Sequence, residues 1–188
     1  MKRCEWAVND EMYVEYHDKE WAVPVHDDKK LFEMLILEGA QAGLSWITIL
    51  RKRENYRNAY DDFDPIKIAK WNSDKIEQLL NNPGIIRNRL KINAAKSNAI
   101  AYLKVAGEYG SFNSFIWSFV NGVPVKNSWK SPTEIPVSTK ESEKMSKELK
   151  RNGFKFVGPT ICYAFMQAVG MVNDHIETCF RYAEIKNL

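Results

Sequence analysis

The chain has 188 residues, of which 45% are hydrophobic and 27% are charged, as in ordinary globular proteins. This composition excludes a disordered chain, and the absence of about 18 consecutive apolar residues without a charge excludes a membrane-spanning one. We therefore expect a single domain over residues 1–188 and, because the start lacks an apolar signal run, a soluble cytoplasmic protein.

The charges are distributed unevenly along the chain. Residues 1–40 carry ten acidic and five basic side chains, whereas residues 41–188 carry 14 acidic and 22 basic ones. Lysine and arginine gain free energy by releasing counterions from phosphates, so this distribution favours a polyanionic partner for the C-terminal part. Solvated helix faces would give the same distribution.

Helix signals recur along the chain and strand signals are scarce, so we predict an all-α fold. The first strong pattern puts five residues on one helical face: Leu31, Met34, Leu35, Glu38 and Ala42. Further along, Asp64 offers an N-cap and Pro65 suits the first position of a helix.

Residues 73–106 predict two helices joined by a sharp turn. Ser73 offers an N-cap for a short helix that ends near Leu80, and the sequence NNPG at 81–84 then breaks the chain. A long helix follows from 86 to 106, where Gly107 and Gly110 are expected to end it. We predict a helix-hairpin-helix at about 74–106.

Three more helices are expected toward the C-terminus, after an apolar helix over 112–120 and an irregular segment over 122–136. Ser138 and Glu141 form a capping-box pattern for a basic helix over 143–151, which Gly153 ends. An apolar helix is predicted over 160–169, and Asn173-Asp174 is predicted to start a short terminal helix.

The turn between the two hairpin helices has features of a phosphate site. Glycine permits a tight turn at Pro83-Gly84-Ile85, and free amides at the N-terminus of the second helix attract phosphate. No acid occurs from Gly84 to Gly107, while four basic residues follow the turn: Arg87, Arg89, Lys91 and Lys96. An ordinary turn between two helices is the alternative.

Glu38 lies on the apolar stripe, where burial of a carboxylate costs several kcal/mol unless it is hydrogen-bonded. The position therefore invites a functional explanation. A salt bridge inside the core and a helix end that has reached solvent are the structural alternatives.

Aromatic residues are dense near the N-terminus and are interleaved with acids: Trp6, Tyr13, Tyr16 and Trp21. Aromatic walls hold a flipped base by stacking, and nearby carboxylates suit a cationic base. The glycine-containing segment 41–46 ends in Trp46 and is suited to present side chains to a ligand from a loop. Core packing is the alternative for each aromatic residue.

Three cysteines at wide spacing argue against a disulfide framework and for a reducing compartment. Cys4 and His17 are separated by 12 residues, and His175 and Cys179, separated by three, are expected to share one helical face. Together these four residues can form a tetrahedral zinc site. Cys162 is expected to be buried, and His26 to be exposed.

The chain resembles the 3-methyladenine DNA glycosylase I family from Cys4 to Cys179. The resemblance rests on several motifs in order: Tyr16-His17-Asp18 with Glu20-Trp21, KLFEM at 30–34, Glu38, QAGLSWIT at 41–48, KRENY at 52–56, GIIR at 84–87, WSFVN at 117–121, GFKFVG at 153–158 and VNDH at 172–175. Two departures are Ala22, where glycine is expected, and the pair Asn82-Pro83 before the hairpin glycine.

The resemblance implies a helix-hairpin-helix glycosylase that releases alkylated adenine from double-stranded DNA. We expect the protein to act as a monomer. The resemblance implies one structural zinc ion, held by Cys4, His17, His175 and Cys179. It also implies roles in the site: base recognition by Glu38 and Tyr16, stacking by Trp46, an aromatic cage of Trp6, Tyr13 and Trp21, contact with the gap left in DNA by Gly43 and Leu44, and backbone contact by Gly84, Ile86, Arg87 and Arg89.

The wider superfamily generally places a catalytic aspartate beyond its hairpin, but this chain has no aspartate between Asp74 and Asp174. The narrower family shares that absence. N3-alkylation makes adenine cationic, so the base leaves neutral and needs no general acid.

Two other functions compete with a glycosylase. A zinc-stabilised module that recognises damaged DNA without cutting it would not need a buried carboxylate beside an aromatic cage, so Glu38 discriminates against it. A catalytic zinc hydrolase needs an open coordination position, which two cysteines and two histidines leave no room for.

Overall fold

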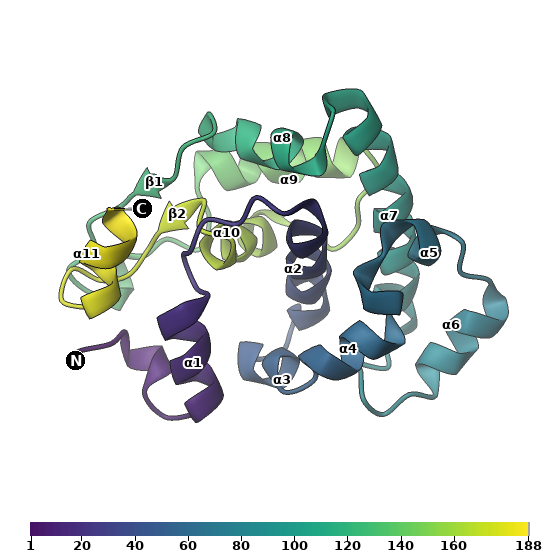
Figure 1. Cartoon of the computed structure of the whole chain (residues 1–188), viewed down its shortest axis with the longest axis horizontal. Helices are drawn as coiled ribbons and strands as arrows, with labels where there is room; N and C mark the ends of the chain where they lie inside the picture. The colour runs from purple at the N-terminus through teal and green to yellow at the C-terminus, as the bar shows by residue number, and fades with distance from the viewer. Residues whose placement is uncertain (188) are drawn as a thin grey trace.

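The computed structural model describes residues 1–187, which are mostly helical (Figure 1). The α-helices are α1 Glu11–Lys19, α2 Asp28–Gln41, α3 Trp46–Leu50, α4 Arg53–Ala59, α5 Pro65–Ala69, α6 Ser73–Leu80, α7 Arg89–Tyr109, α8 Phe112–Trp117, α9 Lys140–Arg151, α10 Pro159–Ala168 and α11 Phe180–Lys186. Short 3-10 helices cover Glu5–Ala7, Asp61–Phe63, Ser118–Val120 and Pro132–Glu134.

The fold is mostly helical as predicted, and two short strands are the exception. Strand β1, Val125–Lys126, pairs in parallel with β2, Val172–Asn173. Each strand has two residues, which is too short for an alternating pattern to be detected in the sequence. The pair attaches the irregular segment 122–136 to the C-terminal part of the chain.

Helix α2 lies at the centre of the molecule (Figure 1) and contacts α3, α7, α8 and α10. Every residue from Leu31 to Ala40 is buried. The predicted apolar stripe is therefore too narrow, because a helix packed on all sides buries its whole circumference. One consequence is that α2 carries two buried glutamates, Glu33 and Glu38.

Helix α6 ends at Leu80 as predicted, whereas α7 begins and ends three residues later than predicted. Asn72, rather than Ser73, caps α6 by accepting a hydrogen bond from the Lys75 amide. Asn88 caps α7 in the same way through the Lys91 amide, so the helix begins at Arg89 and not at residue 86. It also continues through Gly107, since one glycine costs only about 1 kcal/mol of helix propensity.

The three helices predicted over 112–120, 143–151 and 160–169 are confirmed, whereas the predicted cap of the second and the predicted start of the terminal helix are wrong. The apolar helices over 112–120 and 160–169 are present as α8 with its 3-10 extension and as α10. The capping box of α9 is formed by Thr139 and Ser142 instead of Ser138 and Glu141. Asn173-Asp174 starts no helix, because Asn173 lies in β2 and α11 begins at Phe180.

Both ends of the described chain lie on the same side of the molecule (Figure 1). The amide of Phe180 donates a 3.0 Å hydrogen bond to the Lys2 carbonyl. Ala22 has φ of +65°, a left-handed conformation in which glycine is unstrained, as the family expectation of glycine there implies. Within residues 1–187, no helix combines the length and apolarity needed to cross a membrane.

Candidate functional site

A cleft of about 530 Å³ opens between the N-terminal segment, the end of α2 and the segment 132–136. All six residues predicted to recognise a base line it: Trp6, Tyr13, Tyr16, Trp21, Glu38 and Trp46. The fold thus brings together side chains from the segment 6–21, from α2 and from α3. The sequence analysis had grouped these side chains into one site only by resemblance.

Glu38 reaches the cleft from the last turns of α2 and is 3% exposed. Its Oε2 is buried without a hydrogen-bond partner among the described residues. Neither structural alternative is therefore met, since the carboxylate forms no salt bridge among the described residues and Glu38 lies in the buried part of its helix. Burial raises the pKa of Glu38 to about 8, so a cationic ligand that donates hydrogen bonds would favour its ionised form.

The second buried glutamate of α2 shows what a structural carboxylate looks like in this protein. Glu33 accepts hydrogen bonds from the Arg57 guanidinium at 2.7 and 3.1 Å and forms an ion pair with Lys30 at 3.3 Å. Glu33 is thus paired and Glu38 is not, although both lie on the same buried helix. This contrast makes Glu38 the candidate binding group of the cleft.

Five aromatic residues line the cleft and pack against one another. Trp6 packs edge-on against Tyr13 at 5.4 Å and against Trp21 at 5.1 Å between ring centroids. Tyr16 lies 5.5 Å from Trp46, with the two rings tilted by 50°. Trp6 remains 37% exposed, so the wall stays open to a planar ligand.

Two of the residues that line the cleft carry polar groups, the Tyr16 hydroxyl and the Trp46 indole nitrogen. The pKa of Tyr16 is raised well above 10, first by burial and then by the charge of Glu38, so its hydroxyl stays neutral and can donate a hydrogen bond. The indole Nε1 of Trp46 is buried and has no partner among residues 1–187. The Tyr13 hydroxyl is engaged, because it accepts a 2.9 Å hydrogen bond from the Ile47 amide.

Two further lining residues, Gln41 and Ser45, belong to the segment 41–46 that was expected to present side chains to a ligand. Sequence reasoning missed the others, namely Pro132, Ile135, Pro136, Ala164 and Gln167. The others come from the irregular segment and α10, which are distant in the chain. No periodicity or spacing indicates that they meet α2.

Gly43 and Leu44 form a turn between α2 and α3. Gly43 has φ of +79°, and the Leu44 amide donates a 2.6 Å hydrogen bond to the Gln41 carbonyl. Leu44 is 41% exposed. An apolar side chain therefore projects from a tight turn whose neighbours, Gln41 and Ser45, line the cleft.

Backbone amides of the hairpin between α6 and α7 donate hydrogen bonds to side chains of the protein itself. Gly84 donates to the Asn82 side chain at 2.8 Å, and Ile86 donates to the Tyr56 hydroxyl at 3.1 Å. A Cβ at Gly84 would lie 3.0 Å from the Cβ of Asn55, so glycine is needed for this close approach. Arg87 is exposed, whereas Arg89 pairs with Glu77 at 2.6 Å.

The other two basic residues of the hairpin do not extend toward solvent as predicted. Lys91 donates to the carbonyls of Ala40 and Ala42, and Lys96 donates to the carbonyl of Trp71. Each lysine thus stabilises a helix end within the protein. The expectation that both add to a phosphate surface is wrong.

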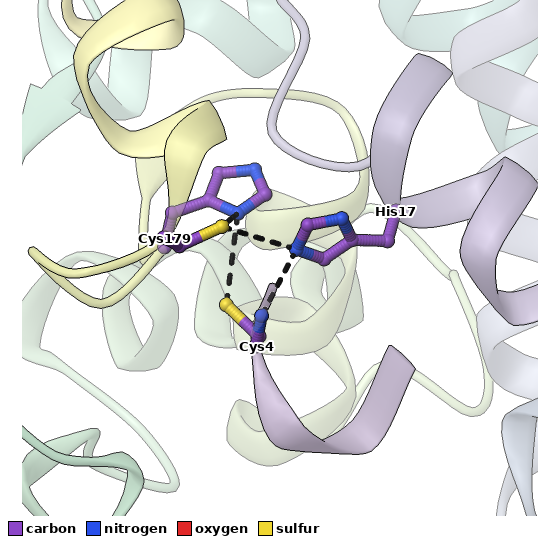
Figure 2. Close-up of side chains that lie close together, drawn as sticks. Cys4, His17 and Cys179 are labelled. Carbon is purple, nitrogen blue, oxygen red and sulfur yellow. Dashed lines mark hydrogen bonds between the residues drawn. The ribbon is translucent and has the colours of Figure 1, made fainter. Parts of the chain in front are cut away.

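A second cluster joins the two ends of the chain: Cys4, His17, His175 and Cys179, all buried (Figure 2). The Cys179 sulfur lies 3.4 Å from His17 Nε2 and 3.5 Å from His175 Nδ1, and the Cys4 sulfur lies 3.7 Å from His175 Nδ1. Tetrahedral zinc with bonds of about 2.0 Å to nitrogen and 2.3 Å to sulfur requires such edges of about 3.3–3.8 Å. The residues fit the metal.

The groups around the cluster also suit metal ligation. His17 Nδ1 lies 2.8 Å from Asp18, whose carboxylate accepts three hydrogen bonds from Arg3. His175 Nε2 lies 3.4 Å from the Trp21 carbonyl. Such contacts orient the imidazoles of metal ligands. The Cys4 thiol and the two imidazoles lower the pKa of Cys179 well below its usual value, which supplies a thiolate.

His175 and Cys179 converge in a way that the sequence interpretation did not foresee. They lie in the turn between β2 and α11, with Cys179 as the N-cap of α11, and not on one helical face. Cys162 is buried and His26 is exposed, as predicted.

Comparisons with known proteins were made for the whole chain. The sequence model of a family described as methyladenine glycosylase matches residues 6–182. DNA-3-methyladenine glycosylase 1 of Escherichia coli (strain K12) is 53% identical over 182 residues, which cover 97% of each chain. DNA-3-methyladenine glycosylase of Haemophilus influenzae is 49% identical, over 94% of this chain and 96% of its own.

Solved structures give the same result. A crystal structure of a 3-methyladenine DNA glycosylase I has a TM-score of 0.93 at 55% identity and covers 95% of this chain and 98% of its own. A 3-methyladenine DNA glycosylase I from Staphylococcus aureus, described for its recognition of 3-methyladenine, has a TM-score of 0.92 at 39% identity and covers 96% of both chains.

Proposed function

Because the chain belongs to the methyladenine glycosylase family, we propose that it is a DNA-repair enzyme that releases 3-methyladenine from DNA by hydrolysing the N-glycosidic bond. The observation that carries this proposal is the unpaired buried carboxylate of Glu38 at the end of a cleft walled by aromatic rings. A flipped base that is planar, cationic and rich in amino hydrogens matches this cleft.

Each polar group of the cleft has a role in holding that base. The ionised Glu38 carboxylate accepts hydrogen bonds from the amino edge and attracts the positive ring, and the neutral Tyr16 hydroxyl donates to a ring nitrogen. Trp46 stacks on one face of the base. Normal adenine shares the amino group but lacks the positive charge, so it binds less strongly.

The chemistry needs no general acid. When the bond between the sugar C1′ and the base breaks, its electron pair moves onto the cationic base, which leaves neutral. Water then adds to the sugar and loses a proton, leaving an abasic site. No aspartate lies between Asp74 and Asp174 to protonate a leaving group, and base extrusion with contacts strengthened in the transition state supplies the rate.

A DNA-binding module that recognises damage without cutting could bind a damaged base but would form no abasic site. We expect the purified protein to create abasic sites in methylated duplex DNA, detected as strand breaks after heating in alkali. Unmethylated DNA is the control and should remain intact. Binding to methylated DNA without such breaks would support the module and overturn the enzyme.

We also propose that Cys4, His17, His175 and Cys179 hold one zinc ion per chain. Two cysteines and two histidines fill a tetrahedral shell, so the metal has a structural role and joins the ends of the chain. A catalytic zinc is disfavoured because no position is left for water, and because none of the four ligands lines the cleft of Glu38.

Double-stranded DNA is proposed to bind across the hairpin, with Gly84, Ile86, Arg87 and Arg89 near its backbone and Gly43 and Leu44 at the gap left by the flipped base. The exposed turn at Leu44 supports insertion into the duplex. Monomeric action and a cytoplasmic location remain predictions from the sequence.

Arg87 is expected to contribute more to DNA affinity than Arg89, because Arg87 is exposed and Arg89 is paired with Glu77. Arg87→Ala should weaken binding to unrelated duplexes equally and lower the slope of log affinity against log salt by about 1. Lys104→Ala, at the far end of α7, is the control and should leave the slope unchanged. An unchanged slope for Arg87→Ala would move the DNA surface away from the hairpin.

The pH dependence of excision should follow the ionisation of Glu38. Because burial raises the pKa of Glu38 to about 8, most of the free protein carries a neutral carboxyl at lower pH, which attracts a cationic base weakly. We expect kcat/KM for methylated DNA to rise with pH and level off above about 8. The rise should disappear in Glu38→Gln, and a flat wild-type profile between about pH 6 and 9 would contradict the role of the carboxylate.

A further inference from the structure

Lys91 connects the second hairpin helix to the end of the helix that carries Glu38. Its ammonium donates 2.7 Å hydrogen bonds to the carbonyls of Ala40 and Ala42, although the two segments lie about fifty positions apart in the chain. Burial lowers the pKa of Lys91. A half-buried ammonium that uses two donors inside the protein is poorly placed to serve as a phosphate ligand.

The end of α2 needs these donors. The last carbonyls of a helix have no partner within it, and the helix dipole gives that end a partial negative charge. Ala42 leaves the helix with φ of −43° and ψ of 117°, and Gly43 then takes a left-handed φ. Lys91 thus satisfies the carbonyls at the point where the chain turns toward Leu44.

The same turn is held on its other side by α1. The Tyr13 hydroxyl accepts a 2.9 Å hydrogen bond from the Ile47 amide, in the first turn of α3. The segment 42–47 is therefore fixed at one end to α7 and at the other to α1. Leu44, at its tip, stays 41% exposed.

We propose that Lys91 is a positioning residue that fixes the Gly43-Leu44 turn relative to the hairpin, so that DNA bound to the hairpin meets the turn at the flipped nucleotide. This inference rests on the proposed function. It assigns Lys91 to the insertion step and to neither phosphate binding nor recognition of the free base.

The test replaces Lys91 with methionine, which keeps the length of the side chain and removes its donors and charge. We expect single-turnover release of 3-methyladenine from methylated duplex DNA to fall about tenfold or more. Binding of free 3-methyladenine, followed by quenching of tryptophan fluorescence, should stay within about twofold of wild type, because the two polar groups proposed to hold the base, Glu38 and Tyr16, lie on α2 and α1 outside the turn.

Lys96→Met is the matched control. Lys96 lies on the same helix, carries the same charge and donates to the carbonyl of Trp71, which does not line the cleft. Both variants lose one positive charge near the hairpin, so both should show the same salt dependence of binding to undamaged DNA, and only Lys91→Met should lose excision.

Each outcome decides the matter. Wild-type excision by folded Lys91→Met, an equal loss in Lys96→Met, or a matching loss of free-base binding would overturn the inference. If Lys91→Met does not fold, Lys91→Gln replaces it in the test, because glutamine keeps one hydrogen-bond donor. Lys91→Gln should show the same selective loss of excision to a smaller degree. Normal excision by Lys91→Gln would overturn the inference. Failure of the wild-type protein to release 3-methyladenine would instead reject the proposed function.

Discussion

Glu38→Gln should fold, retain its metal and lose excision of 3-methyladenine by about a hundredfold or more. The substitution keeps the shape of the side chain, removes its charge and turns an amide donor toward the amino edge of the base. Both changes oppose binding of a cationic base in a cleft where electrostatic interactions are strong. Single-turnover release from methylated duplex DNA measures the effect, alongside zinc content and melting temperature.

The change in stability should have the opposite sign to the change in activity. Because burial raises the pKa of Glu38 from 4.5 to about 8, the carboxyl destabilises the fold when it ionises. That cost is absent below pH 4.5, grows as the pH rises, and is complete above about 8. The melting temperature of Glu38→Gln minus that of wild type should therefore be larger at about pH 8 than at about pH 6.

Glu33→Gln is the control for a buried glutamate on α2. It removes the charge that Arg57 and Lys30 pair with, so it should lower the melting temperature, because these two half-buried cations lose a carboxylate partner. Excision by the folded fraction should be preserved, because Glu33 does not line the cleft. Near wild-type excision by Glu38→Gln, or an equal loss in both variants, would reject a role for Glu38 in base recognition.

Cys179→Ala should lower the free energy of unfolding by about 3 kcal/mol or more, because it removes one of four ligands from an ion that ties both ends of the chain together. The bound zinc should fall well below one ion per chain. Metal analysis of protein purified without added zinc, followed by thermal unfolding, measures both effects.

Cys162→Ala is the matched control, since Cys162 is equally buried but lies outside the cluster. It should cost only the burial of one sulfur, about 1 kcal/mol, and leave the metal in place. A chelator should lower the melting temperature of wild type and of Cys162→Ala, but not of Cys179→Ala. Equal losses of stability in the two variants would count against the metal site.

Much of the fold follows from local signals in the sequence. Asp64 and Pro65 begin α5 as predicted, because an N-cap and a proline at the first position act within one turn. The boundaries of α7 and α9 were misplaced because neighbouring residues compete for the cap. Asn88 and Thr139 satisfy the free amides where Ile86 and Ser138 were expected to lie at the helix start.

The C-terminal misassignment has a tertiary cause. Asp174 resembles a helix start, but its buried carboxylate accepts four hydrogen bonds, from the side chains of Asn127, Trp129, Tyr163 and Gln167. These donors come from the irregular segment and α10. A residue that joins distant segments cannot be distinguished from a cap by its local sequence.

The candidate site likewise has a part that the sequence predicts and a part that only the tertiary fold assembles. Glu38 and Trp46 lie within nine positions of each other, so the α2 side of the cleft was accessible to sequence reasoning. Pro132, Ile135 and Gln167 reach the cleft only through the tertiary fold, and the hairpin lysine Lys91 turned inward because the end of α2 lies beside α7. Long-range packing decided which polar groups remain without a partner.

The central claim is tested most directly by identifying the base that the wild-type protein releases from DNA. Duplex DNA treated with a methylating agent contains several methylated bases, and chromatography of the soluble products separates them. The account predicts that 3-methyladenine is released within a single turnover while adenine and 7-methylguanine stay in the DNA. Absence of 3-methyladenine from the products, or release of unmodified adenine at a similar rate, would contradict it.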